Sequence, residues 1–219
     1  MESLAVILQS LRLDSTVLSL AHLSGEWGVS TRGAPGVILH GVLSGRCFVE
    51  RADAPGEHVE LGPGEMVALP RGEAHTLRAH PKARATPITA LPNRPAGSTR
   101  VLEFGTAPGQ APETRILCGL ARLDHPAARG LVDLLPPVLV ARGKTPAQVR
   151  WIESTLLMAE EEALSGGSQL RSLVDALFVR ALVQAAEAGT APSGLLAAAR
   201  DEKIGRALAF VHTQPSGTL

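Results

Sequence analysis

Hydrophobic and polar positions follow two different periods along this chain of 219 residues. From Ser15 to His80 the apolar stretches are short, and Gly and Pro separate them, which is typical of strands. We expect six strands there, in the segments TVLSLAHLS, GVILHGVLSG, RCFVERA, EHVELG, EMVALPRG and AHTLRA. So many short strands in about 65 residues indicate an antiparallel sandwich or barrel.

The segments on either side of these strands carry weaker patterns. Residues 2–12 predict a helix, because apolar residues recur there at helical spacing. Residues 81–113 are rich in Pro, Gly, Ala and Thr and predict a long surface excursion with one strand, VLEF. A further strand, TRILCGLARL, ends at Asp124.

After His125 the apolar period becomes helical. PAARGLVDLLPP predicts a short helix ended by the two prolines, and VLVAR predicts a further strand. Thr145 and Pro146 have the residue types of an N-cap and a first helical position, and the apolar stripe that follows reaches about Leu164. Ser168 is the expected cap of a second helix, so a short Gly turn joins the two helices into an antiparallel hairpin.

The second helix of this hairpin carries a continuous apolar stripe. One of the two helices need not face the barrel, so we take the stripe as a candidate dimer interface. Its candidate residues are Leu170, Leu173, Val174, Leu177 and Leu182. The acidic run Glu160–Glu162 on the first helix is expected to face solvent.

Composition and charge exclude several classes of protein. Lys+Arg and Asp+Glu both number 21, so the net charge is zero and the chain lacks the basic excess of a free-standing nucleic-acid binder. No apolar run approaches the ~18 residues of a membrane span, and the N-terminus lacks the order of a signal peptide. We therefore expect a cytoplasmic protein with no membrane contact. In that compartment Cys47 and Cys118 are expected to be buried thiols or metal ligands.

The most specific local pattern runs from Gly64 to His75. The segment GEMVALPRGEAH has Gly, five residues, Pro-x-Gly, two residues and His. Gly64 opens a turn, EMVAL alternates into a strand, and Pro70 with Gly72 makes a tight bend before His75 begins the return strand. This segment resembles the second conserved motif of the cupin superfamily. The resemblance implies a jelly-roll or double-stranded β-helix barrel in which His75 points inward, often as a metal ligand.

The companion cupin motif is degenerate in GVILHGVLSG. Gly45 occupies the place of its closing Gly, but Ile38 stands where the family has Glu, and no His pair precedes it. His40 shares the face of Ile38 by strand alternation and should point inward. A site of His40, His75 and Cys118 would suit Zn(II), and these three residues are also the candidates for an effector pocket. An inward His with ordinary polar partners beside a buried thiol is an equally good interpretation.

The order of motifs along the chain has a wider resemblance. An N-terminal helix, L-x-G-R-C, LPRGxAH, RILCG followed by LDHP, LLPP and a two-helix hairpin are together similar to the sensor half of AraC-type transcriptional regulators with a cupin effector domain. The final DEKIGRALAFVHTQP is similar to the first helix of that family's DNA-binding domain. The resemblance implies a cupin effector domain at 1–126, a helical dimerisation region at 127–190, and a linker with the first helix of a truncated helix-turn-helix domain at 191–219.

The sequence therefore predicts a mainly β protein, a cupin barrel followed by a helical hairpin, that is not an enzyme. We expect it to bind a small-molecule effector, to form a homodimer, and to contact DNA through a C-terminal domain missing from this chain. The alternative from another class is a small metal-dependent cupin enzyme, such as a dioxygenase or isomerase. The degenerate motif argues against that alternative, because His40 and His75 alone are too few ligands for the usual iron chemistry.

Overall fold

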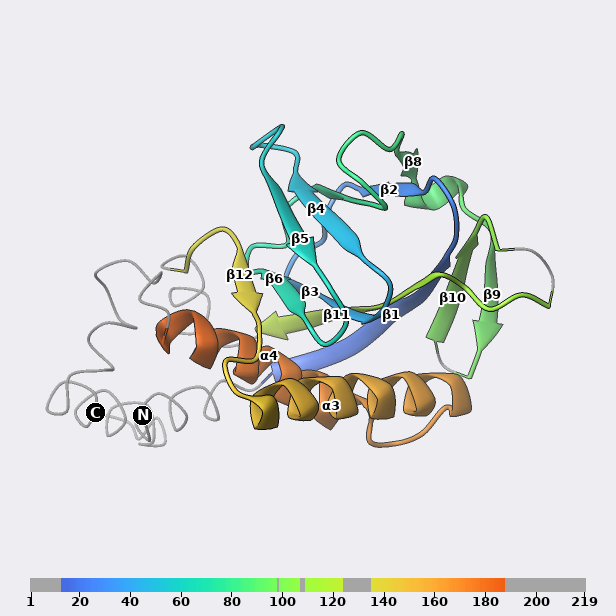
Figure 1. Ribbon diagram of the computed structural model, residues 1–219. Helices are drawn as coiled ribbons and strands as arrows, with labels where there is room; N and C mark the ends of the chain where they lie inside the picture. Colours follow the sequence, from blue (N-terminus) through green and yellow to red (C-terminus); the bar gives the residue numbers. More distant parts are fainter. Residues whose placement is uncertain (1–12, 98, 107–108, 124–134, 188–219) are drawn as a thin grey trace, which may run out of the picture.

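Two β-sheets face each other, and two long helices lie together under the larger sheet (Figure 1). The computed structural model describes residues 13–97, 99–106, 109–123 and 135–187. Within this part of the chain no helix is both long enough and apolar enough to cross a membrane.

The larger sheet has seven strands in the order β12-β6-β3-β11-β1-β10-β9. All neighbours are antiparallel except β1 and β10. The strands are β1 (Leu13–Leu23), β3 (Val37–Ser44), β6 (Met66–Leu69), β9 (Asn93–Ala96), β10 (Thr99–Phe104), β11 (Thr114–Leu123) and β12 (Leu139–Ala141).

The smaller sheet has five strands in the order β5-β4-β7-β2-β8, with only β2 and β8 parallel. Its strands are β2 (Gly28–Thr31), β4 (Cys47–Arg51), β5 (His58–Leu61), β7 (His75–Arg78) and β8 (Thr86–Pro87), and a short 3-10 helix, η1 (Ile88–Ala90), follows β8. Trp27 is buried in the apolar core between the two sheets.

Strand alternation divides the larger sheet into two chemically different faces. On β3, Val37 and Leu39 pack with the helices, whereas Val42 packs with the smaller sheet. On β11, Leu117 faces the helices and Cys118 faces the barrel interior. Each central strand therefore contributes to two cores at once.

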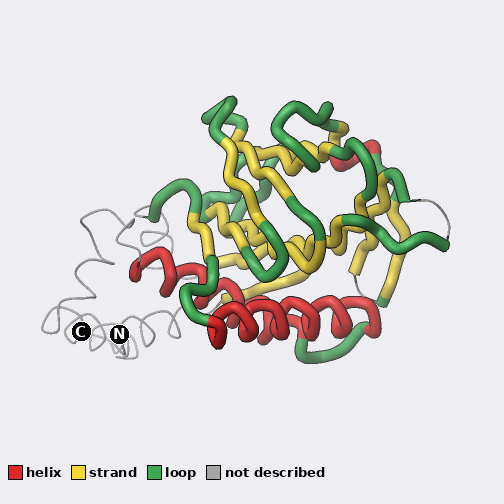
Figure 2. The backbone as a smooth tube through the Cα atoms, in the orientation of Figure 1, coloured by secondary structure: helices red, strands yellow, loops and turns green. Residues whose placement is uncertain are grey.

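The helices α3 (Pro146–Ser165) and α4 (Leu170–Glu187) cover one side of the strands only (Figure 2). The Thr145 side chain accepts a hydrogen bond from the Gln148 N–H, which is the predicted N-cap. Gly41 on β3 allows close packing of α3, since a Cβ there would stand 2.3 Å from Leu156 Cδ2. The predicted barrel followed by a helical hairpin is confirmed.

The strand predicted within 81–113, VLEF, is confirmed as part of β10, and its Val101 is fully buried beside β1. The rest of this segment is more regular than the predicted surface excursion, because it also contains β8, η1 and β9. The partner of β10 was not predictable, because β10 pairs in parallel with a strand about 80 residues earlier, which no local pattern reveals. Strand β2 was also missed. The predicted helices at 2–12 and within 126–135, and the whole of 191–219, lie wholly or largely outside the described residues.

Glu160 departs from the prediction that the acidic run faces solvent, whereas Glu161 is exposed as predicted. For Glu160 the structure shows a different role. Its side chain is buried, and its Oε2 accepts a hydrogen bond from Arg115 Nη1 at 2.6 Å. Arg115 lies on β11 and also donates from Nε to Ser44 Oγ. This ion pair links α3 to the larger sheet. Without Arg115, the buried Glu160 carboxylate would have no positive partner, which is costly.

Candidate functional site

The Gly64–His75 motif carries the chain from one sheet to the other. Strand β6 pairs in the larger sheet and β7 in the smaller one, so the bend crosses the barrel rather than returning along the same sheet. Gly72 has φ +63°, and a Cβ there would stand 1.8 Å from the Ala34 carbonyl oxygen. Only glycine fits this position without moving backbone. Gly64 and Gly45 likewise have positive φ, at +73° and +78°.

The three residues proposed as a pocket or metal site come together in space although they lie on three strands. His40 Nε2 lies 2.7 Å from His75 Nε2, and His40 Nδ1 lies 3.2 Å from Cys118 Sγ. His75 Nδ1 lies 2.7 Å from the backbone carbonyl oxygen of Glu73. All three side chains are buried. His40 and Cys118 are direct neighbours in the register of β3 and β11, which explains their contact.

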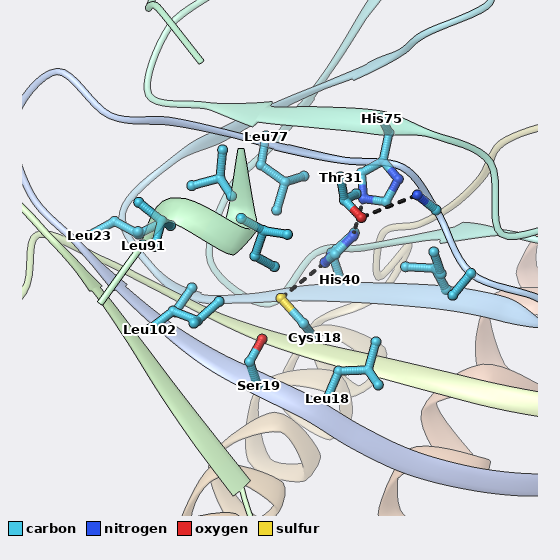
Figure 3. A pocket seen from close by; sticks show the side chains of 16 residues that line it. Leu18, Ser19, Leu23, Thr31, His40, His75, Leu77, Leu91, Leu102 and Cys118 are labelled. Atoms are coloured by element: carbon cyan, nitrogen blue, oxygen red, sulfur yellow. Dashed lines mark hydrogen bonds between the residues drawn. The ribbon is translucent and has the colours of Figure 1, made fainter. Parts of the chain in front are cut away.

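A cavity of about 180 Å³ lies beside these residues, between the two sheets. Figure 3 shows His40, His75 and Thr31 on one side of it and Leu23, Leu91 and Leu102 on the other. Leu18, another lining residue, is 40% exposed, so the cavity extends to the protein surface there. The apolar part of the wall includes Leu23, Val29, Leu77, Ile88, Leu91 and Leu102.

Burial sets the protonation state of the three residues. It lowers the pKa of His40 well below its ordinary value, and the neighbouring His75 lowers it further. Burial also lowers the pKa of His75, against the opposing effect of its hydrogen bond to the Glu73 carbonyl. Burial raises the pKa of the Cys118 thiol to about 12, although a hydrogen bond from Ser19 opposes the shift. At neutral pH the two imidazoles are uncharged and the thiol is protonated.

The arrangement of these side chains does not fit a zinc ion. Two imidazoles bound to one tetrahedral zinc hold their nitrogens about 3.3 Å apart, given Zn–N distances of about 2.0–2.1 Å. His40 Nε2 and His75 Nε2 are closer than that, at a hydrogen-bonding distance of 2.7 Å. Cys118 contacts the other nitrogen of His40, so the ring stands between the thiol and His75. Among the described residues no group of three or more His, Cys, Asp or Glu has the geometry of a metal site.

The candidate dimer residues on α4 face the chain's own core. Val174, Leu177 and Leu182 are each at most 1% exposed, and Leu170 and Leu173 pack against the same core. Because this stripe is buried against the chain's own core, it leaves little accessible area for a second copy of the chain. The exposed large apolar side chains of the hairpin are instead on α3, namely Trp151, Leu157, Met158 and Leu164.

No pattern in the sequence identifies two further residues of the site. Ser19 lines the cavity beside Cys118, its partner in the register of β1 and β11, and Thr31 lines the cavity close to His75 (Figure 3). Ser and Thr are common in strands, and only the pairing of β1 with β11 and of β2 with β7 brings these two to the cavity.

Two opposed sheets, an inward His at the start of β7 and the Gly-Pro-Gly spacing before it define a cupin-type barrel protein. The chain belongs to the cupin family, because the family model described as Cupin matches residues 2–187. A comparison with curated proteins found no match.

Solved structures of ToxT from Vibrio cholerae, an AraC-family regulator, are similar at a low level. The apo form is 5% identical with a TM-score of 0.42, over 82% of this chain and 56% of ToxT. The form bound to an unsaturated fatty acid is 6% identical with a TM-score of 0.42, over 80% and 55%. The form bound to a naphthalenyl-butenoic acid is 8% identical with a TM-score of 0.42, over 94% and 67%.

This chain thus spans between about half and two thirds of the ToxT chains it matches.

Proposed function

We propose that this chain is the sensor part of an AraC-type transcription regulator and binds a small-molecule effector in the cavity between its sheets. The cavity is the observation that carries the proposal. A barrel of this family keeps an apolar space of about 180 Å³ open to the surface near Leu18, and its His residues hydrogen-bond to one another instead of forming a metal site.

The strands β3 and β11 connect the cavity to the helices, because neighbouring residues on each strand line the cavity and contact a helix. His40 lines the cavity, and the next residue, Gly41, lies under Leu156 of α3. Cys118 also lines it, and the next residue, Gly119, lies 3.2 Å, measured from its ideal Cβ, from Val174 of α4. A ligand that displaces either strand therefore moves the surface on which a helix rests. Such a ligand shifts the equilibrium between two arrangements of the protein only if it binds these two arrangements with different affinity.

The proposed regulator acts as a homodimer in the cytoplasm. Because the stripe on α4 is buried, the α3 side chains Trp151, Leu157, Met158 and Leu164 are the better candidates for the dimer surface. DNA would be bound by a domain encoded after Leu219. Sequencing the natural reading frame past that residue tests this part. Some 80–100 further residues with two helix-turn-helix patterns would support it, and an immediate stop codon would contradict it.

The effector-binding part is tested by a thermal-shift screen of small apolar molecules against the wild-type chain and Ala21→Leu. Ala21 lines the cavity and is buried, so a leucine there reduces the space. Ala52→Leu is the matched control, since Ala52 is exposed and outside the cavity wall. Stabilisation of the wild type and of Ala52→Leu but not of Ala21→Leu supports the proposal. If all three proteins respond alike, or none responds, the cavity is not the binding site.

A further inference from the structure

The hydrogen bonds at the polar side of the cavity can run in one direction only. A backbone carbonyl accepts and cannot donate, so His75 Nδ1 must carry the proton that it shares with the Glu73 carbonyl. In a neutral imidazole the other nitrogen is then an acceptor. His75 Nε2 therefore accepts from His40 Nε2–H across 2.7 Å.

The same reasoning continues to the other end of the row. Because Nε2 of neutral His40 carries its proton, Nδ1 accepts, and the Cys118 S–H donates to it. The Ser19 side chain lies beside this end of the row, since Ser19 and Cys118 are partners in the register of β1 and β11 (Figure 3). The row is Cys118 S–H to His40, then His40 N–H to His75, then His75 N–H to the Glu73 carbonyl.

Every proton of this row already has an acceptor within the protein. A ligand in the cavity can take none of them without breaking a buried hydrogen bond, and an unpaired buried group is costly. Thr31 is different. Its Oγ1 accepts from the Gly33 N–H at 3.2 Å, and among the described residues its own O–H has no acceptor. Thr31 O–H is therefore the donor that the wall leaves available to a ligand.

The cavity wall carries no formal charge. None of its lining residues is Lys, Arg, Asp or Glu, and its two histidines are neutral in the hydrogen-bonded row. The Glu73 carboxylate acts on His75, and it is itself in an ion pair with Arg71. An anion placed here would lose its hydration and gain no positive partner.

The size of the cavity limits how much of a ligand can be enclosed below the opening near Leu18. A cavity of about 150 Å³ lined by apolar side chains can hold a benzene molecule. The present cavity is about 180 Å³. It has room for one ring with a short substituent.

We propose that the cavity selects an uncharged, one-ring-sized apolar molecule with a single hydrogen-bond acceptor, which Thr31 O–H recognises. This rests on the proposed effector-binding function and names the ligand class of the same cavity. The neutral row of Cys118, His40 and His75 forms a wall that excludes carboxylates.

Three probes of matched size test the proposal by isothermal titration calorimetry on the wild-type chain at about pH 8, where histidines are neutral. Acetophenone is uncharged with one acceptor, ethylbenzene lacks the acceptor, and benzoate replaces the methyl ketone by a carboxylate. We expect acetophenone to bind tightest and benzoate at least about tenfold more weakly, because no cation meets its charge. In Thr31→Val, acetophenone should lose about threefold to tenfold in affinity while ethylbenzene stays unchanged.

The outcomes separate this proposal from the function on which it rests. Benzoate binding as tightly as acetophenone, with both lost in Ala21→Leu, would overturn the neutral-ligand inference and leave effector binding intact. Equal loss of acetophenone and ethylbenzene in Thr31→Val would overturn the role of Thr31. Failure of all three probes and of xenon to enter the cavity would overturn the proposed function, and the inference would fall with it.

Discussion

The two faces of the larger sheet use the same strands for different purposes. Toward the helices, β3 and β11 present apolar side chains and glycines that bring α3 and α4 close, as at Gly41 and Leu156. Toward the smaller sheet, the alternate positions hold His40 and Cys118 beside a cavity. Close packing stabilises the first face, whereas the second gives up packing contacts to leave space for a ligand. Residues that stabilise the fold and residues that line the cavity thus alternate along each of these two strands.

The sharpest test of this contrast compares Leu156→Ala with Leu102→Ala. Leu156 is buried between α3 and the sheet, so its truncation should lower the free energy of unfolding by about 2–5 kcal/mol. Leu102 borders an existing cavity, and the same truncation should cost distinctly less while weakening ligand binding. Urea denaturation of both variants measures the difference. Equal losses would mean that the two faces are packed alike.

The outer surface of α3 provides the next largest effect. If it forms the dimer, Leu157→Glu should weaken association by about 2 kcal/mol or more, as charge replaces an apolar contact residue. Light scattering over a concentration series measures the shift from dimer to monomer. Glu57→Gln, at an exposed position outside α3, is the control. A wild-type chain that is monomeric at micromolar concentration contradicts the dimer.

The two histidines on the barrel side of the larger sheet should make the free energy of unfolding depend on pH. Burial holds the pKa of both His40 and His75 below the value in the unfolded chain, so the unfolded state binds protons first as the pH falls. The free energy of unfolding should therefore decrease below about pH 6.5, by about 1.4 kcal/mol per pH unit for each histidine. Urea titrations between about pH 7 and 5 measure the slope. In His40→Gln the slope should become shallower, and an unchanged slope would show that other groups cause it.

Metal binding should have the smallest effect. Because His40 and His75 are hydrogen-bonded to each other, protein purified without chelator should contain far less than one zinc per chain. Chelator treatment should leave the midpoint of thermal unfolding unchanged. One zinc per chain that is lost in His40→Gln would require these side chains to rearrange around the metal.

The local pattern of the sequence determined most of the strands, the helical hairpin and the cupin motif. Glycines at 64 and 72, the Pro between them and the Thr145 cap impose backbone geometry within a few residues, which is why these features were predictable. Strand alternation also placed His40 on the inward face. Those are short-range constraints, and they act whatever the rest of the chain does.

The tertiary structure alone decided how distant residues meet. The parallel pairing with β1 gave the predicted strand VLEF its place in the larger sheet, and the ion pair with Arg115 accounts for the burial of Glu160. The register of β3 with β11 joined His40 to Cys118, and the crossing at Gly72 brought His75 to the same row. Whether these residues bind a metal or one another depends on distances of a few tenths of an ångström. Such distances follow from packing between strands far apart in the chain, which no local pattern encodes.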